Sequence, residues 1–171
     1  MCERYGRAVD YRTEFIPDFA RRTLSNLDAI EATDRSGTEP VYPVTQLWNS
    51  LLGLIVLPRE RDVKRFGRVM MPDLWSDGWP RITSPSSKRE HKRLRDLLTD
   101  LRNAVAHFNV EFIAGTDSEI TAVTVWALDT DAGGRPIPGT RSWEGRITVT
   151  ELARLARGVA DLYINQAAAS R

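Results

Sequence analysis

The segment from Pro43 to Leu57 constrains the fold most strongly, because it is apolar on nearly every side of a helix. Its apolar side chains include Val44, Leu47, Trp48, Leu51, Leu52, Leu54, Ile55 and Val56. A helix of this kind is buried, either at the centre of a helical bundle or at a subunit interface. The longest apolar run, residues 51–57, is far short of the roughly 20 residues that cross a bilayer. We therefore predict a helical protein without a membrane helix.

Three more segments, about 17–32, 88–109 and 149–168, show the spacing of amphipathic helices. Ser87 with Glu90, and Thr148 with Glu151, have the spacing of a capping box at the start of the last two. The predicted core face of 88–109 consists of Leu94, Leu97, Leu98, Leu101, Val105 and Phe108. Residues 59–85 between the second and third helices are predicted to be a long irregular loop.

The apolar period changes to two between residues 110 and 149, which is typical of strands. The predicted strands are about 110–114, 120–128 and 142–149, with a hairpin tip at Gly133-Gly134. In residues 142–149, for example, Trp143, Gly145, Ile147 and Val149 alternate with polar residues. The sequence thus predicts one domain over residues 1–171, a four-helix bundle with a small antiparallel sheet inserted between the third and fourth helices.

The composition excludes several classes of site. One cysteine, Cys2, rules out a disulfide framework or a thiolate metal cluster, and two histidines make a multi-histidine zinc site improbable. We predict no metal and no cofactor. The charged N-terminus has no apolar signal core, so we expect a cytoplasmic protein.

Positive charge is concentrated in the middle of the chain. Residues 59–102 contain 12 Lys and Arg against 7 Asp and Glu, although the whole chain has a net charge of only +1. The densest part surrounds His91 and contains Lys88, Arg89, Lys92, Arg93 and Arg95. Two interpretations stay open here: a solvated helix start, or a track for the RNA backbone formed by Lys88, Arg89, Lys92 and Arg95. GC-rich coding also accounts for the preference for arginine over lysine.

The third predicted helix contains the sequence Arg102-Asn103-Ala104-Val105-Ala106-His107. An arginine followed by asparagine and, four positions later, by histidine resembles the motif of the HEPN superfamily (higher eukaryotes and prokaryotes nucleotide-binding domains). The leucine stripe of this helix and its place as the third of four helices strengthen the resemblance, which covers about residues 15–165.

The resemblance implies a metal-independent endoribonuclease that acts on RNA as a homodimer. Arg102, His107 and Asn103 would be its catalytic residues, and the products would carry a 2′,3′-cyclic phosphate. A bacterial toxin or a phage-defence effector fits this activity, with a protein antitoxin or another masking partner. The alternative is a non-catalytic HEPN module that binds a nucleotide or a partner, or serves in dimerisation.

Helix geometry adds one condition to this reading. Asn103 and His107 are four residues apart and share a face, whereas Arg102 and His107 differ by about 140° around the axis. A twofold axis near this helix would bring two copies of both residues into one cleft. The other possibilities are that His107 only caps the helix and that Arg102 pairs with Asp100 or Glu111.

Gln46, Asn49 and Gly53 interrupt the apolar segment 43–57 on one face. Buried amides need hydrogen-bond partners, so the two amides either bond a neighbouring element or line a functional site.

Overall fold

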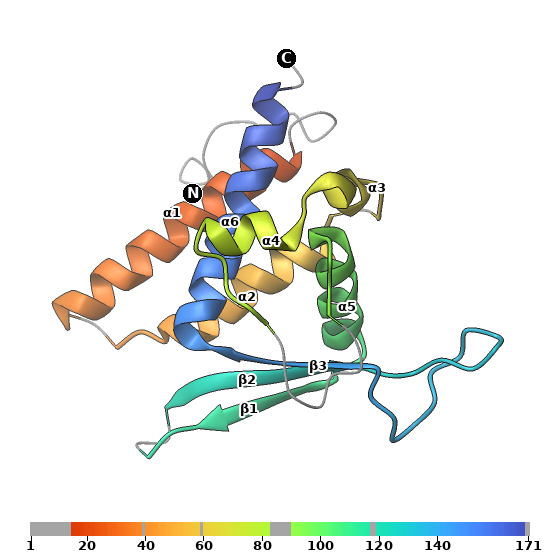
Figure 1. Ribbon diagram of the computed structural model, residues 1–171. Helices are drawn as coiled ribbons and strands as arrows, with labels where there is room; N and C mark the ends of the chain where they lie inside the picture. The colour runs from red at the N-terminus through yellow and green to blue at the C-terminus, as the bar shows by residue number, and fades with distance from the viewer. Residues whose placement is uncertain (1–14, 39, 59, 83–89, 117–118, 170–171) are drawn as a thin grey trace, which may run out of the picture.

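The protein is mainly helical, with six α-helices and a three-stranded antiparallel sheet in the part of the chain that the structure describes (Figure 1). The structure is a computed structural model and describes residues 15–38, 40–58, 60–82, 90–116 and 119–169. The helices are α1 (Phe15–Ser36), α2 (Pro43–Val56), α3 (Glu60–Lys64), α4 (Met71–Ser76), α5 (Leu94–Ala106) and α6 (Val149–Ala169), with a 3-10 turn, η2 (Arg65–Arg68). The strands are β1 (Val110–Ala114), β2 (Ile120–Ala127) and β3 (Trp143–Thr148).

Helix α2 lies at the centre of the helical layer and packs against α1, α5 and α6. Leu47, Leu51, Leu54 and Ile55 of this helix are buried, which confirms its predicted place in the core. Helix α1 approaches α2 so closely that a Cβ atom at Gly53 would lie 2.6 Å from Cζ of Phe19. None of the described helices is long and apolar enough to cross a membrane.

Helix α6 follows β3 without a linker, and its start is fixed by the predicted capping box. The backbone N–H of Thr148 donates to Oε2 of Glu151 (2.8 Å), and the N–H of Glu151 donates to Oγ1 of Thr148 (3.3 Å). These two bonds satisfy donors that a helix start leaves unpaired. On the other side of α6, Arg157 binds Asp28 and Glu31 of α1.

Helix α5 begins six residues later than the predicted start at residue 88. Ser87 lies outside the described residues, and Glu90 is not helical. The backbone here pairs with another segment instead: Met71 N–H donates to Lys92 O (2.9 Å), and Leu94 N–H donates to Val69 O (3.0 Å). This short bridge holds residues 92–93 extended, so the helix can begin only at Leu94.

Residues 60–76 are more regular than the predicted loop, since they contain α3, η2 and α4. Phe66, Met71 and Leu74 are buried and connect this segment to the core. The tryptophans of the region pack against the core, and Trp79 lies directly against Gly158 of α6. The helices are too short to produce a recognisable period in the sequence, which explains the wrong prediction.

The sheet has the order β1-β2-β3 and lies beneath the helices, with α5 packed on β2 and α6 on β2 and β3 (Figure 1). The register pairs Val110 with Val125 and Val123 with Ile147. Trp143, Gly145 and Ile147 are buried and alternate with their neighbours as predicted. On β1, by contrast, Phe112 is 41% exposed and touches Trp48 of α2 edge-on (centroids 5.3 Å apart).

The connection between β2 and β3, residues 128–142, extends beyond the end of the sheet (Figure 1). Its tip is a local turn in which Oδ1 of Asp131 accepts hydrogen bonds from the N–H groups of Gly133 and Arg135, both at 2.8 Å. Residues 130–139 are all exposed, so the turn is held by hydrogen bonds among its own residues rather than by the core.

Candidate functional site

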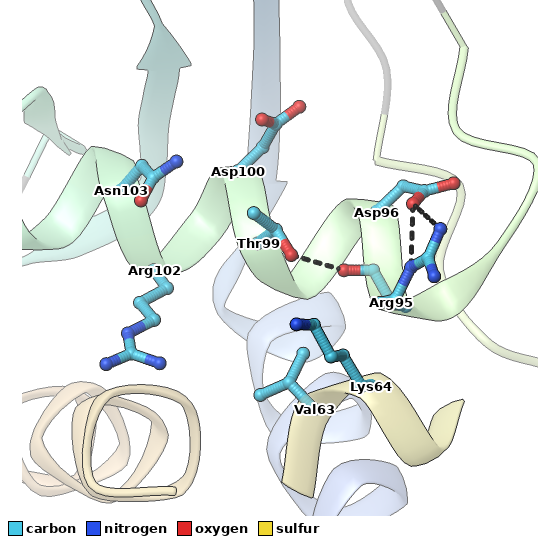
Figure 2. A pocket seen from close by; sticks show the side chains of 8 residues that line it. All are labelled: Val63, Lys64, Arg95, Asp96, Thr99, Asp100, Arg102 and Asn103. Atoms are coloured by element: carbon cyan, nitrogen blue, oxygen red, sulfur yellow. Dashed lines mark hydrogen bonds and ion pairs between the residues drawn. The ribbon is translucent and has the colours of Figure 1, made fainter. Parts of the chain in front are cut away.

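Two residues of the HEPN-like motif, Arg102 and Asn103, line a pocket of about 660 Å³ between α5 and α3 (Figure 2). The other lining residues are Val63, Lys64, Arg95, Asp96, Thr99 and Asp100. Helix α5 supplies one wall because its opposite face, with Leu97, Leu98 and Leu101, is buried in the core. The amphipathic pattern of α5 therefore determines which of its residues reach the pocket.

Three cationic residues line this pocket, Lys64 from α3 and Arg95 and Arg102 from α5 (Figure 2). Both carboxylates of the lining have partners: Asp96 accepts two bonds from Arg95 (3.2 Å each), and Asp100 binds His91. Guanidinium and ammonium groups grouped in this way suit a phosphate or another multivalent anion.

Arg102 is half-buried and extends toward the end of α2, where its Nη1 donates to the carbonyl oxygen of Pro58 (3.3 Å). Its charge also acts on Tyr163 of α6. Burial raises the pKa of Tyr163 above its usual range, and the charge of Asp62 raises this pKa further. The charge of Arg102 lowers the same pKa by a smaller amount. The Tyr163 hydroxyl has no hydrogen-bond partner among the described residues. Arg102 thus lines the pocket and also acts electrostatically on a buried residue of α6.

His107 does not line the pocket that contains Arg102. It is the C-cap of α5 (φ −100°, ψ 7°), and its backbone N–H donates to Asn103 O (3.0 Å). Its side chain is exposed, as is that of Asn103. Figure 2 shows Asn103 projecting from α5 on the side away from Arg102. Within one chain the motif therefore presents Arg102 and Asn103 in different directions, as helix geometry predicts.

Residue 108 departs from the predicted core face of α5. Phe108 is 78% exposed, whereas Leu94, Leu97, Leu98 and Leu101 are buried as expected. The helix ends at Ala106, and the backbone of Phe108 turns into the left-handed region with a φ of 55°. The side chain consequently leaves the stripe that the helical period assigns to it.

His91 is buried, so the prediction that it lies at a solvated helix start is wrong. It is 7% exposed, and its Nε2 lies 2.6 Å from Oδ2 of Asp100, itself 7% exposed. The edge of its ring meets Trp143 of β3 at a centroid distance of 4.9 Å. The extended segment before α5 allows His91 to fold back along the helix. The pair ties the start of α5 to the sheet directly behind the pocket.

The other residues of the predicted basic track are spread over different surroundings. Lys88 and Arg89 lie outside the described residues, and Lys92 is exposed. Arg95 lines the pocket beside Arg102, and its Nη1 would lie 3.5 Å from a Cβ atom at Gly67 of η2. Among the residues of the predicted RNA track that the structure describes, Arg95 is the one that lines the same pocket as the motif residues Arg102 and Asn103.

The two amides of α2 do not line this pocket. Gln46 is half-buried, and its Nε2 donates to Oγ of Ser50 one turn later (3.5 Å). Asn49 is exposed. The described structure therefore shows Gln46 bonding its own helix.

Sequence reasoning missed Lys64 and Thr99 as lining residues. Thr99 lies on the predicted helix, but its hydroxyl bonds to Arg95 O (2.8 Å), a common local contact that carries no functional signal. Lys64 belongs to the segment predicted as a loop. Its only sequence signal was the excess of positive charge in residues 59–102.

The described residues contain no group of three or more His, Cys, Asp or Glu side chains that could hold a metal ion.

Comparison with protein-family models gives a match to the HEPN pEK499 p136 family over residues 5–169. The chain belongs to the HEPN superfamily. The match spans every described helix and strand of this HEPN protein, including the sheet before α6. No match was found among curated proteins or among solved structures. The resemblance inferred from the residues around Arg102 and His107 is thus confirmed at the level of the family.

Proposed function

We propose that this HEPN protein is a metal-independent endoribonuclease. The observation that carries the proposal is the pocket whose lining combines Arg102 and Asn103 of the motif with Lys64 and Arg95. HEPN domains are frequently ribonucleases, and a polyanionic strand is the substrate that such a cationic pocket favours.

RNA carries its own nucleophile, so the protein needs no covalent intermediate. The 2′-oxygen attacks phosphorus, the bond from phosphorus to the 5′-oxygen breaks, and the products carry a 2′,3′-cyclic phosphate and a 5′-hydroxyl. One proton leaves the 2′-hydroxyl and one joins the 5′-oxygen. Histidine titrates near neutral pH and can perform either transfer, which is the role we propose for His107.

Arg102 stabilises the negative charge that develops on the phosphoryl oxygens, since a guanidinium can donate two parallel hydrogen bonds to them. Asn103 orients the phosphate or the His107 imidazole. Lys64 and Arg95 hold neighbouring phosphates. In this arrangement α3, which sequence reasoning did not detect, is part of the substrate site.

The proposed active form is a homodimer. His107 does not line the pocket that contains Arg102, and the two residues are about 140° apart around the axis of a helix, so we propose that one chain alone does not bring them together. A twofold axis near α5 places Arg102 of one protomer beside His107 of the other, which forms two equivalent composite sites in the dimer.

We further propose that the enzyme acts in the bacterial cytoplasm as a toxin or a phage-defence effector. An unrestrained ribonuclease harms its own cell, so a protein antitoxin or another masking partner fits this role. Fold membership alone does not assign a biological role, and growth arrest on expression is the direct readout.

The test is cleavage of end-labelled RNA in EDTA by wild type, by His107→Ala and by Asn26→Ala, which removes an exposed polar side chain on α1. We expect wild type and Asn26→Ala to cleave and His107→Ala to lose activity. End-group analysis should find the cyclic phosphate, and a 2′-deoxy nucleotide at the scissile position should block cleavage. Cleavage of that substrate would contradict the mechanism.

Two observations favour a second candidate, a non-catalytic HEPN binding module. Arg102 already bonds Pro58 O, and His107 lies outside the pocket. On this view the pocket binds a nucleotide or a partner without cleaving it. A folded dimeric wild type that binds RNA tightly and never cleaves it would favour the module.

A further inference from the structure

Phe108 combines an exposed aromatic ring with a backbone conformation that large residues avoid. It follows His107 directly, is 78% exposed and has a φ of 55°. It is the one residue other than glycine with a positive φ in the described ranges. A bulky side chain at a positive φ is a genuine outlier that needs an explanation.

The local hydrogen bonds place Phe108 at a position where glycine is preferred. Phe108 N–H donates to Val105 O (3.1 Å), and Asn109 N–H donates to Ala104 O (2.7 Å). This pair of bonds is the Schellman motif that ends many helices, and Phe108 occupies its left-handed residue. Glycine or asparagine closes the same turn with less strain.

Burial does not compensate for this strain, since most of the ring faces solvent. The residue therefore satisfies neither the backbone preference of the turn nor the hydrophobic core. A residue that breaks local rules without a gain in stability marks a functional position.

The surroundings of the ring indicate what it binds. Asn103, His107 and Glu111 of the same region are exposed and polar. An exposed aromatic ring in a segment with hydrogen-bonding groups matches a nucleobase, which has a π face and polar edges.

We propose that Phe108 is a stacking platform for a nucleobase of the RNA strand bound beside His107. The Schellman bonds fix the backbone on both sides of Phe108, so the ring is presented to the strand in a defined place. This inference rests on the proposed RNA substrate, and it adds a base-binding subsite to a site that otherwise contacts phosphates and the reacting atoms.

The test measures binding of short single-stranded RNA, in the His107→Ala background so that the strand stays intact. Phe108→Gly should weaken binding by roughly 5- to 150-fold, the range for one stacked base. Phe108→Trp should retain binding. Tyr42→Ala is the matched control, since Tyr42 is 75% exposed and caps α2, and it should bind as before.

A series of RNAs with one abasic nucleotide at each position in turn identifies the stacked base. Loss of one particular base should weaken binding when Phe108 is present and should have no effect in Phe108→Gly. Equal losses in both proteins at every position would overturn the inference.

Thermal unfolding separates this role from a structural one. Phe108→Gly removes the strain of the left-handed turn, so its Tm should equal or exceed that of the parent protein. A clear fall in Tm, together with a fall for Phe108→Asn, would assign the ring to folding. Conversion of dimer to monomer with unchanged RNA affinity would assign it to a subunit contact. Either result overturns the proposal.

The outcomes also distinguish this inference from the proposed function. If wild type cleaves RNA and neither cleavage nor binding depends on Phe108, only the proposed stacking platform is wrong. If RNA binds with the expected dependence on one base but is never cleaved, only the proposed nuclease activity is wrong. If RNA does not bind at all, both proposals are wrong.

Discussion

Arg102 has to serve two groups at once, the Pro58 carbonyl within the chain and the phosphate of the proposed substrate. A guanidinium carries five N–H donors in a rigid plane, so Nη1 can keep its bond to Pro58 while the other edge faces the pocket. The internal bond then orients the side chain before the substrate arrives. A lysine offers a single point charge and cannot satisfy both partners in fixed directions.

Arg102→Lys should therefore lower the rate of RNA cleavage by about 100-fold or more, as loss of a transition-state donor does elsewhere. The measurement is kcat/KM on a defined RNA, with Arg146→Lys on the exposed face of β3 as the control. Activity of Arg102→Lys within a few-fold of wild type would mean that only the charge of residue 102 matters.

The burial of Tyr163 leads to a prediction of how the stability of the protein depends on pH. Its pKa is raised in the folded protein by burial, so the folded state keeps the phenol proton at a pH where the unfolded chain, with a pKa of about 10, loses it. The unfolded state then binds fewer protons, and stability falls as pH rises above that value, by up to about 1.4 kcal/mol per pH unit.

Tyr163→Phe should remove this alkaline loss and cost little at neutral pH, because the buried hydroxyl has no hydrogen-bond partner among the described residues. The free energy of unfolding in urea, measured between pH 8 and 11, tests the expectation. Tyr42→Phe changes an exposed tyrosine and should keep the alkaline slope. A steep slope that survives in Tyr163→Phe would point to another group.

Helix α5 shows what the sequence can predict about an element and what it cannot. Its leucine stripe predicts the buried face, and the motif predicts that Arg102 and Asn103 lie off that face, as they do. Its start was predicted wrongly because the bridge between Met70 and Arg93 depends on a distant segment. The position of His91 was predicted wrongly for the same reason, because only the extended segment allows its side chain to reach Asp100.

The short helices α3 and α4 were not predicted from the sequence, for a different reason. Five or six residues give fewer than two turns, so no apolar period develops, and tertiary contacts of Phe66 and Leu74 decide the conformation. The pocket residue Lys64 was missed with them. Long elements with one buried face, such as α6, were predicted nearly to their ends.

Trp79 packs closely against α6. A Cβ atom at Gly158 would overlap the indole of Trp79, which has little freedom to move because it packs against the core. Gly158→Ala should therefore destabilise the protein by about 1–3 kcal/mol from overpacking, less the roughly 1 kcal/mol that alanine gains in a helix.

The matched control is Gly67→Ala in η2, where the nearest atom to a Cβ is 3.5 Å away, in Arg95. Chemical denaturation of the two variants should show a loss for Gly158→Ala alone. If both variants match wild type, Trp79 shifts at no cost and does not anchor the segment.

At the scale of the whole molecule, the proposed site needs residues of two protomers. Mixing Arg102→Ala with His107→Ala tests this directly. In a mixed dimer, one of the two composite sites receives an intact Arg102 and an intact His107, so random mixing should restore about a quarter of wild-type cleavage. Each variant alone should be inactive.

Purified variants that are unfolded together and refolded together provide the mixture, and sedimentation confirms that dimers form. Absence of any recovery, despite mixed dimers, would place the complete site within one chain. Recovery without dimers would show that the two residues do not act as a composite pair.

The projecting connection between β2 and β3 has a practical consequence for studying this molecule. Residues 130–139 are exposed and held by the Asp131 turn, apart from α5 and its pocket. A peptide tag or a fluorescent label inserted at Gly133-Gly134 should leave folding and binding unchanged, since insertions are best tolerated at exposed loop tips. The loop therefore provides a labelling position for following one protomer inside a living cell.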